Sequence, residues 1–276
     1  MKEYDIVLLT ESRYEKPVTP NWYEQNILDD DKLLQHALEQ KGLSVIRKDW
    51  ATPNFNWGNV RYAVFRTTWD YFDRFDEFNQ WLISTGKRTT FINPLSLIQW
   101  NIDKTYLSDV HKKGINMPPT QFHDTSNTMG LVEWFNESNW KEAVVKPTIA
   151  GAARYTYRIS AANIDEVAQI IDPLIKQEKF ILQEFQHNIV TEGEVSLIVI
   201  GGKFTHAVLK IAKPGDFRGQ DDFGGSVHAY EPSQEEISFA EKAVEACPSL
   251  PTYARVDIFR DNQNVLARTH TNRNLI

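Results

Sequence analysis

Several classes of protein are excluded by features that the 276-residue sequence lacks. It has a single cysteine, Cys247, so neither an internal disulfide nor a zinc site built from cysteines is possible. No apolar run approaches the roughly 20 residues needed to cross a bilayer, and the charges near the start of MKEYDIVLLT are not typical of a secretory signal. We therefore expect a cytoplasmic protein with no membrane partner.

Familiar nucleotide and metal motifs are also absent. There is no GxGxxG run and no Walker-type lysine loop, which excludes the Rossmann dinucleotide and P-loop classes. None of the seven histidines has convincing zinc spacing or an obvious nucleophile beside it. A net charge of −7 argues against nucleic-acid binding along a basic surface, but it allows a local basic pocket for a small ligand.

The first third of the chain alternates strands and helices. Periodicity predicts strands at 4–10, 43–50 and 62–68, and helices at 29–42 and 76–87. This alternation is typical of a parallel sheet with covering helices. Ligands bind such sheets at the carboxyl ends of the strands, so we expect the loops after the strands to contact a substrate.

The pattern changes after the INP segment that ends at Pro94. One linker helix is predicted over 95–114, followed by α+β organisation with antiparallel sheets. Helices are predicted near 128–137, 163–176 and 234–246. The predicted strands are 118–123, 141–147, 154–160, 179–185, 193–202, 203–212 and a terminal hairpin that begins at Tyr253.

Lys146 ends the β-branched run EAVVKP, just before the small-residue loop TIAGAARY. A lysine in this place can reach phosphate oxygens while loop N–H groups supply further donors. The alternative is an edge-strand lysine whose ammonium extends to solvent. Gln183 and Glu184 end another strand, where the chain can offer its backbone to an adenine edge and one of two nearby acids, Glu192 or Glu194, can bind ribose; a charged surface loop is the alternative.

The segment LKIAKPGDFRGQDDFGG combines glycines with the cations Lys210, Lys213 and Arg218. Arg218 could hold an anionic intermediate through paired hydrogen bonds, or the segment is a solvated loop of mixed charge. In YARVDIF, strand alternation places Arg255 and Asp257 on one face. A buried acid needs a partner, so Asp257 is either a Mg²⁺ ligand or half of a structural ion pair.

Taken in order, these motifs resemble those of the ATP-grasp ligases. The resemblance rests on WNIDK, VVKP, LQEF, EGEVSLIVIGG, KPGDFRGQDDFGG and ARVDIF, and it covers most of the chain. FRTTWDY and INPLSLIQWNIDKTYL make it most similar to the branch with glutathione-synthetase-like ATP-binding domains, ribosomal-protein glutamate ligases and the cycloserine-forming ligase.

The resemblance implies an α/β plus α+β architecture, the ATP-grasp fold. Residues 1–95 would form an N-terminal parallel-sheet domain, and 96–185 and 186–276 two α+β lobes that enclose the nucleotide. The implied activity is ATP-dependent joining of a small, amino-acid-like carboxylate to an amine through an acylphosphate, with ATP and Mg²⁺ as cofactors. Phosphoryl transfer mainly needs positioning and charge neutralisation, which fits a chain with no nucleophile–base pair.

The resemblance also assigns roles to single residues. Arg218 and Arg255 would be catalytic and stabilise the acylphosphate and the tetrahedral intermediate, and Asp257 would bind Mg²⁺. Strand-end logic adds that Arg13, Arg66 and Trp69 face the carboxylate substrate. The residues assigned to the nucleotide are Lys104, Lys146, Gln183, Glu184, Phe185, Glu194 and Lys210.

The sequence departs from the family in the strand after Asp257. The family has further acidic or amide metal ligands there, whereas this chain has LARTHTNRN, with Arg268 and Arg273. Read one base later with AGA arginine codons, this stretch can spell an acidic apolar strand, so we expect a truncated or frameshifted C-terminus. A nucleotide-binding protein or an inactivated ligase is therefore the alternative function, and a small-molecule kinase is a third.

Overall fold

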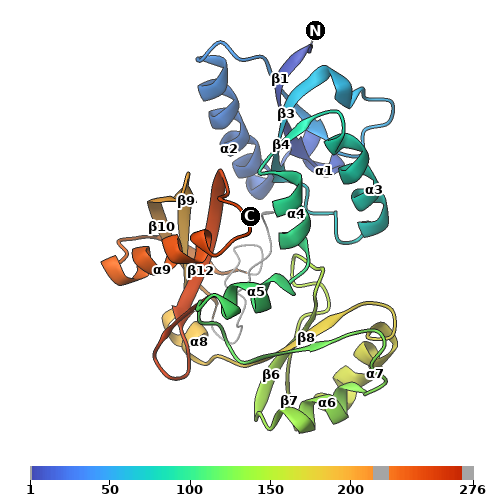
Figure 1. Cartoon of the computed structure of the whole chain (residues 1–276), viewed down its shortest axis with the longest axis vertical. Helices are drawn as coiled ribbons and strands as arrows, with labels where there is room; N and C mark the ends of the chain where they lie inside the picture. The colour runs from blue at the N-terminus through green and yellow to red at the C-terminus, as the bar shows by residue number, and fades with distance from the viewer. Residues whose placement is uncertain (1, 214–223, 269–276) are drawn as a thin grey trace. The chain divides into compact units, whose positions relative to one another are not determined.

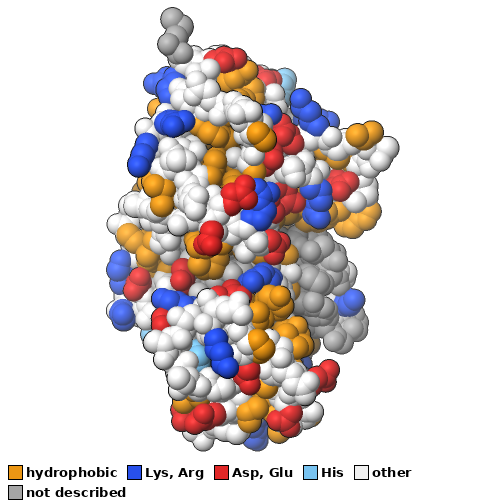
Figure 2. Space-filling view, turned by 90° about the vertical axis from the view of Figure 1, so that its right-hand side faces the viewer, with side chains coloured by type: hydrophobic (Ala, Val, Ile, Leu, Met, Phe, Trp, Pro, Cys, Tyr) orange, Lys and Arg blue, Asp and Glu red, His pale blue; other side chains and the backbone are white. Residues whose placement is uncertain are grey.

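The computed structural model describes residues 2–213 and 224–268. The chain forms two compact units, Met1–Trp100 and Asn101–Asn272, which we call unit 1 and unit 2. Within the described ranges, no helix is long and apolar enough to cross a membrane. On the face seen in Figure 2, Lys and Arg side chains lie among Asp and Glu side chains, in keeping with the modest net charge of −7.

Unit 1 contains a four-stranded parallel sheet in the order β2-β1-β3-β4 (Figure 1). The predicted parallel sheet is confirmed, and β4 is a short addition that the sequence pattern did not reveal. The strands are β1 (Tyr4–Thr10), β2 (Val45–Asp49), β3 (Val60–Thr67) and β4 (Thr90–Ile92). The short elements α1 (Ser12–Glu15) and η1 (Trp57–Asn59) belong to the connecting loops.

The sheet of unit 1 is covered on both faces. Helix α2 (Trp22–Glu39) packs Leu34 and Leu38 against the core of β1 and β2. Helix α3 (Phe75–Gly86) covers the other face with an aromatic cluster: Trp50 lies 5.1 Å from Phe78 between ring centroids. Most of the tryptophans of this Trp-rich chain lie in unit 1.

Helix α2 begins seven residues before the predicted start at Asp29. The Asn21 side chain accepts hydrogen bonds from the N–H groups of Tyr23 and Glu24, and the Glu24 carboxylate accepts the N–H of Asn21. This reciprocal cap satisfies the first donors of the helix and so sets where it begins. The prediction was wrong because it took the acidic run as the helix start.

The single linker helix predicted over 95–114 is two helices, α4 (Leu95–Ile102) and α5 (Tyr106–Lys112). The break contains Lys104, whose N–H donates to the carbonyl of Thr148 at 3.0 Å instead of continuing a helix. The Asp103 carboxylate accepts the N–H of Thr105 at 2.9 Å. A long-range contact and a local acceptor therefore interrupt a pattern that looks helical throughout.

Unit 2 contains two antiparallel sheets, as predicted. The first has the order β5-β8-β6-β7, and α6 (Leu131–Ser138) and α7 (Ile164–Leu174) cover one of its faces. Its core unites Trp134 and Phe135 of α6 with Ile171 of α7. The strands are β5 (Thr120–His123), β6 (Glu142–Pro147), β7 (Tyr157–Ser160) and β8 (Phe180–Glu184).

The second sheet has the order β11-β10-β9-β12-β13. The short helix α8 (Asn188–Glu192) precedes it, and α9 (Gln234–Glu245) covers its apolar face (Figure 1). Ser233 and Glu236 form a reciprocal cap at the start of α9. The strands are β9 (Glu194–Ile200), β10 (Lys203–Ile211), β11 (Ser226–Tyr230), β12 (Tyr253–Arg260) and β13 (Leu266–Arg268).

Candidate active site

The face of the second sheet opposite α9 carries a group of polar side chains from three strands. In the strand register Ser196 lies opposite Asp257, and Glu194 lies opposite Lys210. Paired residues of antiparallel strands share a face, and residues two apart do so as well, which adds Arg255. We call these five residues the charged face.

Asp257 lies at the centre of the charged face and is only 4% exposed. Its Oδ2 accepts from Arg255 Nε at 3.0 Å, and its Oδ1 lies 3.4 Å from Lys210 Nζ and accepts from the Ser196 hydroxyl. Burial raises the pKa of Asp257, but Arg255, Lys210 and the hydrogen bond from Ser196 outweigh it and hold the pKa below its usual value. The carboxylate therefore stays ionised at neutral pH.

Lys210 also lies 3.8 Å from the buried carboxylate of Glu194. The charged face thus balances two acids against two cations, and the ion pair between Arg255 and Asp257 is the structural alternative that the sequence left open. Such mutual pairing stabilises buried charges. It also places two cations where they can exchange a carboxylate partner for a phosphate.

Lys146 extends from β6 on the side of the first sheet away from α6 and α7, since its neighbours Val145 and Leu182 belong to the helix-side core. Burial lowers the pKa of Lys146 to about 8, although Glu194 of the other sheet acts to raise it. Glu194 of the charged face therefore acts on the charge of Lys146 within unit 2.

Lys104 is 2% exposed, and its ammonium donates to the carbonyls of Thr148 and Ala150 at 3.1 and 3.0 Å. Burial, followed by the charge of Lys146, brings the pKa of Lys104 well below its usual value. The Lys104 side chain thus binds the loop that follows β6 through two carbonyl oxygens of that loop. The two lysines therefore lie together at the base of that loop.

The loop after β6 contains three non-glycine residues in left-handed conformation, Ala152, Ala153 and Tyr155, with φ of 47°, 57° and 47°. Such conformations turn successive N–H groups toward one side, which is typical of anion-binding loops. Arg154 anchors the loop through a bidentate pair with Glu178, both contacts at 2.9 Å. The single glycine of the loop concealed this geometry in the sequence.

Gln183 and Glu184 lie on opposite faces of β8. The Gln183 amide donates to the Thr120 hydroxyl at 2.8 Å, whereas Glu184 pairs with Ala143 on the helix side. The next residue, Phe185, donates its N–H to the carbonyl of Glu142 at 3.0 Å. Its carbonyl accepts from the side-chain amide of Asn262, in the turn between β12 and β13, at 2.9 Å. The backbone of Phe185 is therefore engaged within the chain.

Two features near Phe185 were not anticipated. The guanidinium of Arg158 lies 3.8 Å above the Phe185 ring and also pairs with Glu142 at 2.7 Å. His187 meets the same ring edge-on at 5.1 Å. Nothing in the local sequence indicates these contacts, because Arg158 belongs to β7, which meets β8 only through β6.

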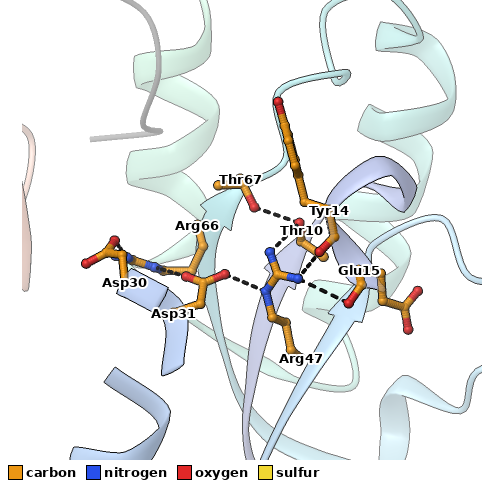
Figure 3. Close-up of polar contacts among 8 residues, drawn as sticks. All are labelled: Thr10, Tyr14, Glu15, Asp30, Asp31, Arg47, Arg66 and Thr67. Atoms are coloured by element: carbon orange, nitrogen blue, oxygen red, sulfur yellow. Dashed lines mark hydrogen bonds and ion pairs between the residues drawn. The ribbon is translucent and has the colours of Figure 1, made fainter. Parts of the chain in front are cut away.

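In unit 1, the predicted substrate-facing residues have mixed environments (Figure 3). Arg66 pairs with Asp30 and, at 2.8 Å from Nε to Oδ1, with Asp31, so it belongs to a buried network. The Arg13 side chain is 61% exposed, near Glu11 at 3.4 Å. Trp69 packs edge-on against the Tyr14 ring at 5.6 Å.

Arg47, which the sequence analysis missed, is the centre of that network (Figure 3). Its Nε lies 2.5 Å from Asp31 Oδ2, and its other nitrogens donate to the carbonyls of Tyr14 and Glu15 and to the Thr10 hydroxyl. These contacts tie the segment after β1 to β2 and α2. The side chains of Arg47 and Asp31 are 11% and 3% exposed, so the centre of the network is almost closed to solvent, whereas Asp30 at its edge is 70% exposed.

Arg218, the second predicted catalytic residue, lies outside the described residues. Arg268 pairs with Ile258 in the ladder, so its side chain lies on the face opposite Asp257, over the Tyr106 ring at 5.1 Å. Arg268 is therefore not a partner of Asp257. Buried as it is, the Nε of Arg268 finds no hydrogen-bond partner among the described residues.

The charged face can hold a Mg²⁺ ion only together with ligands that the protein itself does not supply. Across the described ranges, no group of three or more His, Cys, Asp or Glu side chains could hold a metal by itself. Magnesium sites are commonly built from one or two carboxylates together with substrate phosphates and water. Asp257 is ionised and can supply one such carboxylate.

Two family profiles match the sequence. The profile of the N-terminal domain of D-cycloserine synthetase DcsG matches residues 6–93. The profile of the RimK-like ATP-grasp domain matches residues 106–272, more than half of the chain.

Relatives and solved structures agree with these matches. The cycloserine biosynthesis protein DcsG of Streptomyces lavendulae is 26% identical over 181 residues, which cover 64% of this chain and 60% of that protein. The crystal structure of D-cycloserine synthetase DcsG has a TM-score of 0.83 at 22% identity, covering 96% of this chain and 90% of that one. The D-alanine–D-alanine ligase of Bacillus anthracis has a TM-score of 0.65 at 13% identity, covering 98% and 86%.

Proposed function

Because the chain belongs to the RimK-like ATP-grasp family, we propose that it is an ATP-dependent ligase that joins a small carboxylate to an amine. The carboxylate would be activated as an acylphosphate, and the amine would then displace the phosphate. The observation that carries the proposal is the charged face, where Arg255 and Lys210 surround a buried, ionised Asp257 near Lys146.

The proposed roles follow from charge and position. Arg255 would stabilise the negative charge that develops on the activated carboxylate, because a preorganised guanidinium needs no reorientation in the reaction. Lys146 and Lys104 would neutralise nucleotide phosphates beside the loop that follows β6. Glu194 would accept the ribose hydroxyls. Asp257 would hold Mg²⁺ together with phosphate oxygens, and the ion when bound would neutralise phosphate charge.

The substrate is proposed to be amino-acid-like. Sequence and structure relatives include a cycloserine biosynthesis protein and a D-alanine–D-alanine ligase, whose names describe small amino-acid-derived products. The segment after β1 in unit 1, with Glu11 and Arg13 adjacent to each other, offers charges of both signs at the strand ends. Such a pair suits a zwitterion.

The test is release of ADP from purified protein with Mg-ATP and a panel of D- and L-amino acids and their derivatives. We expect ADP release that depends on one carboxylate and one amine, with a new C–N bond in the product by mass spectrometry. Failure to bind ATP by calorimetry would overturn the proposal.

A nucleotide-binding protein without turnover is the second candidate function. The described part of the terminal hairpin places Arg268 on the face away from Asp257 and adds no acid to Asp257 and Glu194 on the charged face. That observation favours a chain that binds ATP but transfers its phosphate poorly. Tight ATP binding with no ADP release for any substrate in the panel would identify this function.

A further inference from the structure

Two cationic side chains and a thiol lie on the helix side of the second sheet, away from the charged face. Arg268, at the end of β13, donates its N–H to the carbonyl of Asn116 at 2.9 Å. Lys113 directly follows α5, and its ammonium donates to the carbonyl of Ala246, at the C-terminus of α9, at 2.7 Å. Cys247 is the next residue along the chain. We call Arg268, Lys113 and Cys247 the Arg268 cluster.

The guanidinium of Arg268 is buried without an anionic partner in the described part of the chain. The residue is 9% exposed, its Nε makes no hydrogen bond there, and no described acid forms an ion pair with it. Its Cζ lies 5.1 Å from the centroid of the Tyr106 ring, but a cation–π contact compensates only part of the cost of burying a charge. Arginine does not lose its proton in proteins, so this charge needs an anion.

The described groups around Arg268 do not supply that anion. Burial raises the pKa of the Cys247 thiol, and the charges of Arg268 and Lys113 act in the opposite direction on the same sulfur. Burial also raises the pKa of the Tyr106 hydroxyl, against the effect of Arg268. The acid that acts on Tyr106 is Asp257, which is already paired on the charged face. Both the thiol and the phenol are therefore neutral at pH 7, beside two cations.

The Arg268 cluster extends from a buried guanidinium to the solvent. Lys113 is exposed and Cys247 is partly exposed, whereas Arg268 is buried. The Cys247 sulfur lies 3.7 Å from the carbonyl of Ala243, within the last turns of α9. A ligand that matches the charge of Arg268 thus has an exposed cation and an accessible thiol beside it.

We propose that the Arg268 cluster binds a small oxyanion, the chemistry that carboxylates and phosphates share. Arg268 is the principal ligand, because a guanidinium donates in parallel to two oxygens of such an anion. Lys113 adds a second positive charge on the solvent side. The bound anion matches the buried charge and stabilises the end of β13. This inference does not rest on the proposed function, since Arg268 lies on the sheet face away from Asp257.

The test uses Cys247, the only cysteine of the chain, as a local reporter. Its alkylation by iodoacetamide, an uncharged reagent, is timed in sodium chloride, acetate and phosphate at one ionic strength and pH. Protection follows 1 + [L]/Kd, so phosphate at twice its Kd should slow alkylation about threefold in the wild type. Arg268→Met should show no protection. The control Arg260→Met, which removes a partly exposed arginine already paired with Glu235, should behave like the wild type.

The two oxyanions identify the source of the ligand. Protection by both salts assigns the site to carboxylates and phosphates alike, and protection by one of them assigns it to that anion. Arg268→Lys keeps the charge but loses the paired donors, so equal protection should require about tenfold more phosphate. No protection of the wild type by either salt would overturn the inference.

Stability gives a second readout. An apolar side chain in place of an unmatched buried cation should raise the urea midpoint of Arg268→Met above that of the wild type in chloride. Phosphate should raise the midpoint more in the wild type than in this variant. Equal phosphate protection of Cys247 in both proteins would contradict the site. Protection that is lost in Arg255→Met but kept in Arg268→Met would place the anion on the charged face and would also overturn the inference.

Discussion

Each unit contains a buried aspartate between two cationic side chains, but the cations differ in what else they bind. In unit 1, Arg47 and Arg66 meet Asp31, and Arg47 also binds main-chain carbonyls (Figure 3). In unit 2, Arg255 and Lys210 meet Asp257, and Lys210 also approaches another carboxylate.

This difference separates a structural charge group from a functional one. A guanidinium that binds backbone carbonyls of a distant segment fixes the path of the chain, and a ligand cannot replace those contacts without moving the backbone. Cations that meet carboxylates on one sheet face, as Arg255 and Lys210 do, can exchange a carboxylate for a phosphate without a change in the path of the backbone. Four substitutions test the comparison.

The largest effect is expected for Arg47→Met. It removes the partner of a buried carboxylate and of two carbonyls, so the free energy of unfolding should fall by about 3 kcal/mol. Urea unfolding followed by tryptophan fluorescence measures this, since most tryptophans lie in unit 1. Lys32→Met is the control, because Lys32 forms an exposed ion pair with Asp29. Its free energy of unfolding should change by less than about 0.5 kcal/mol. Equal effects would contradict a structural role for the network.

Arg255→Met should instead reduce activity. Removing a guanidinium that stabilises developing charge is expected to lower kcat/KM about 100-fold. Asp257 keeps Lys210 and Ser196 as partners, so the free energy of unfolding should fall less than in Arg47→Met. Arg260→Met, on the same strand with a partly exposed partner Glu235, should leave kcat/KM within about twofold. Steady-state ADP release measures both. A large loss of stability without loss of turnover in Arg255→Met would place it with Arg47.

Glu11, at the end of β1, provides a pH-dependent test of unit 1. Burial, followed by the charge of Asp70, raises the pKa of Glu11 from 4.5 to about 7. The folded state therefore binds the proton more tightly, and this stabilisation is present below pH 4.5 and lost as pH rises toward 7. Glu11→Gln should reduce the loss of stability between pH 5 and 8 by about 1–2 kcal/mol, a value discounted for the exposed Arg13.

Chemical denaturation at both pH values, on the wild type and Glu11→Gln, measures the difference. Parallel pH profiles for the two proteins would show that Glu11 ionises in the folded state as it does in the unfolded chain.

The smallest expected effect concerns protons at Lys146, whose pKa is about 8. At pH 8.5 most Lys146 side chains are neutral in the free protein, and nearby nucleotide phosphates would raise the pKa. ATP binding should then take up roughly half a proton more in the wild type than in Lys146→Met. Calorimetry in two buffers of different ionisation enthalpy measures the uptake. An identical uptake in both proteins would show that phosphate does not approach Lys146.

Much of the secondary structure was predictable because it depends on short periodic patterns. Alternation in YARVDIF placed Arg255 and Asp257 on one face, and the observed 3.0 Å contact between them confirms it. The parallel sheet of unit 1, the antiparallel sheets of unit 2 and most of the long helices were also predicted correctly. The errors arose where capping or distant contacts overrode the pattern, as at the start of α2 and at Lys104 in the break between α4 and α5.

The candidate site was predictable only in part. Lys210, Glu194 and Asp257 were each named, but nothing in the sequence indicates that Lys210 contacts both acids, because this depends on the register of three strands. Arg47 and Asn262 were missed for the same reason. Each acts on residues more than 30 positions away in the chain.

The sequence by itself determined the classes that are excluded, the order of the elements and the alternation that turns Arg255 and Asp257 to one side. These follow from composition and from local periodicity, which short segments carry without help from the rest of the chain. Only the tertiary structure decided that Asp257 lies between two cations and that Arg47 joins the segment after β1 to α2 in unit 1. Such contacts depend on strand register and on the packing of distant segments, and no local pattern encodes them.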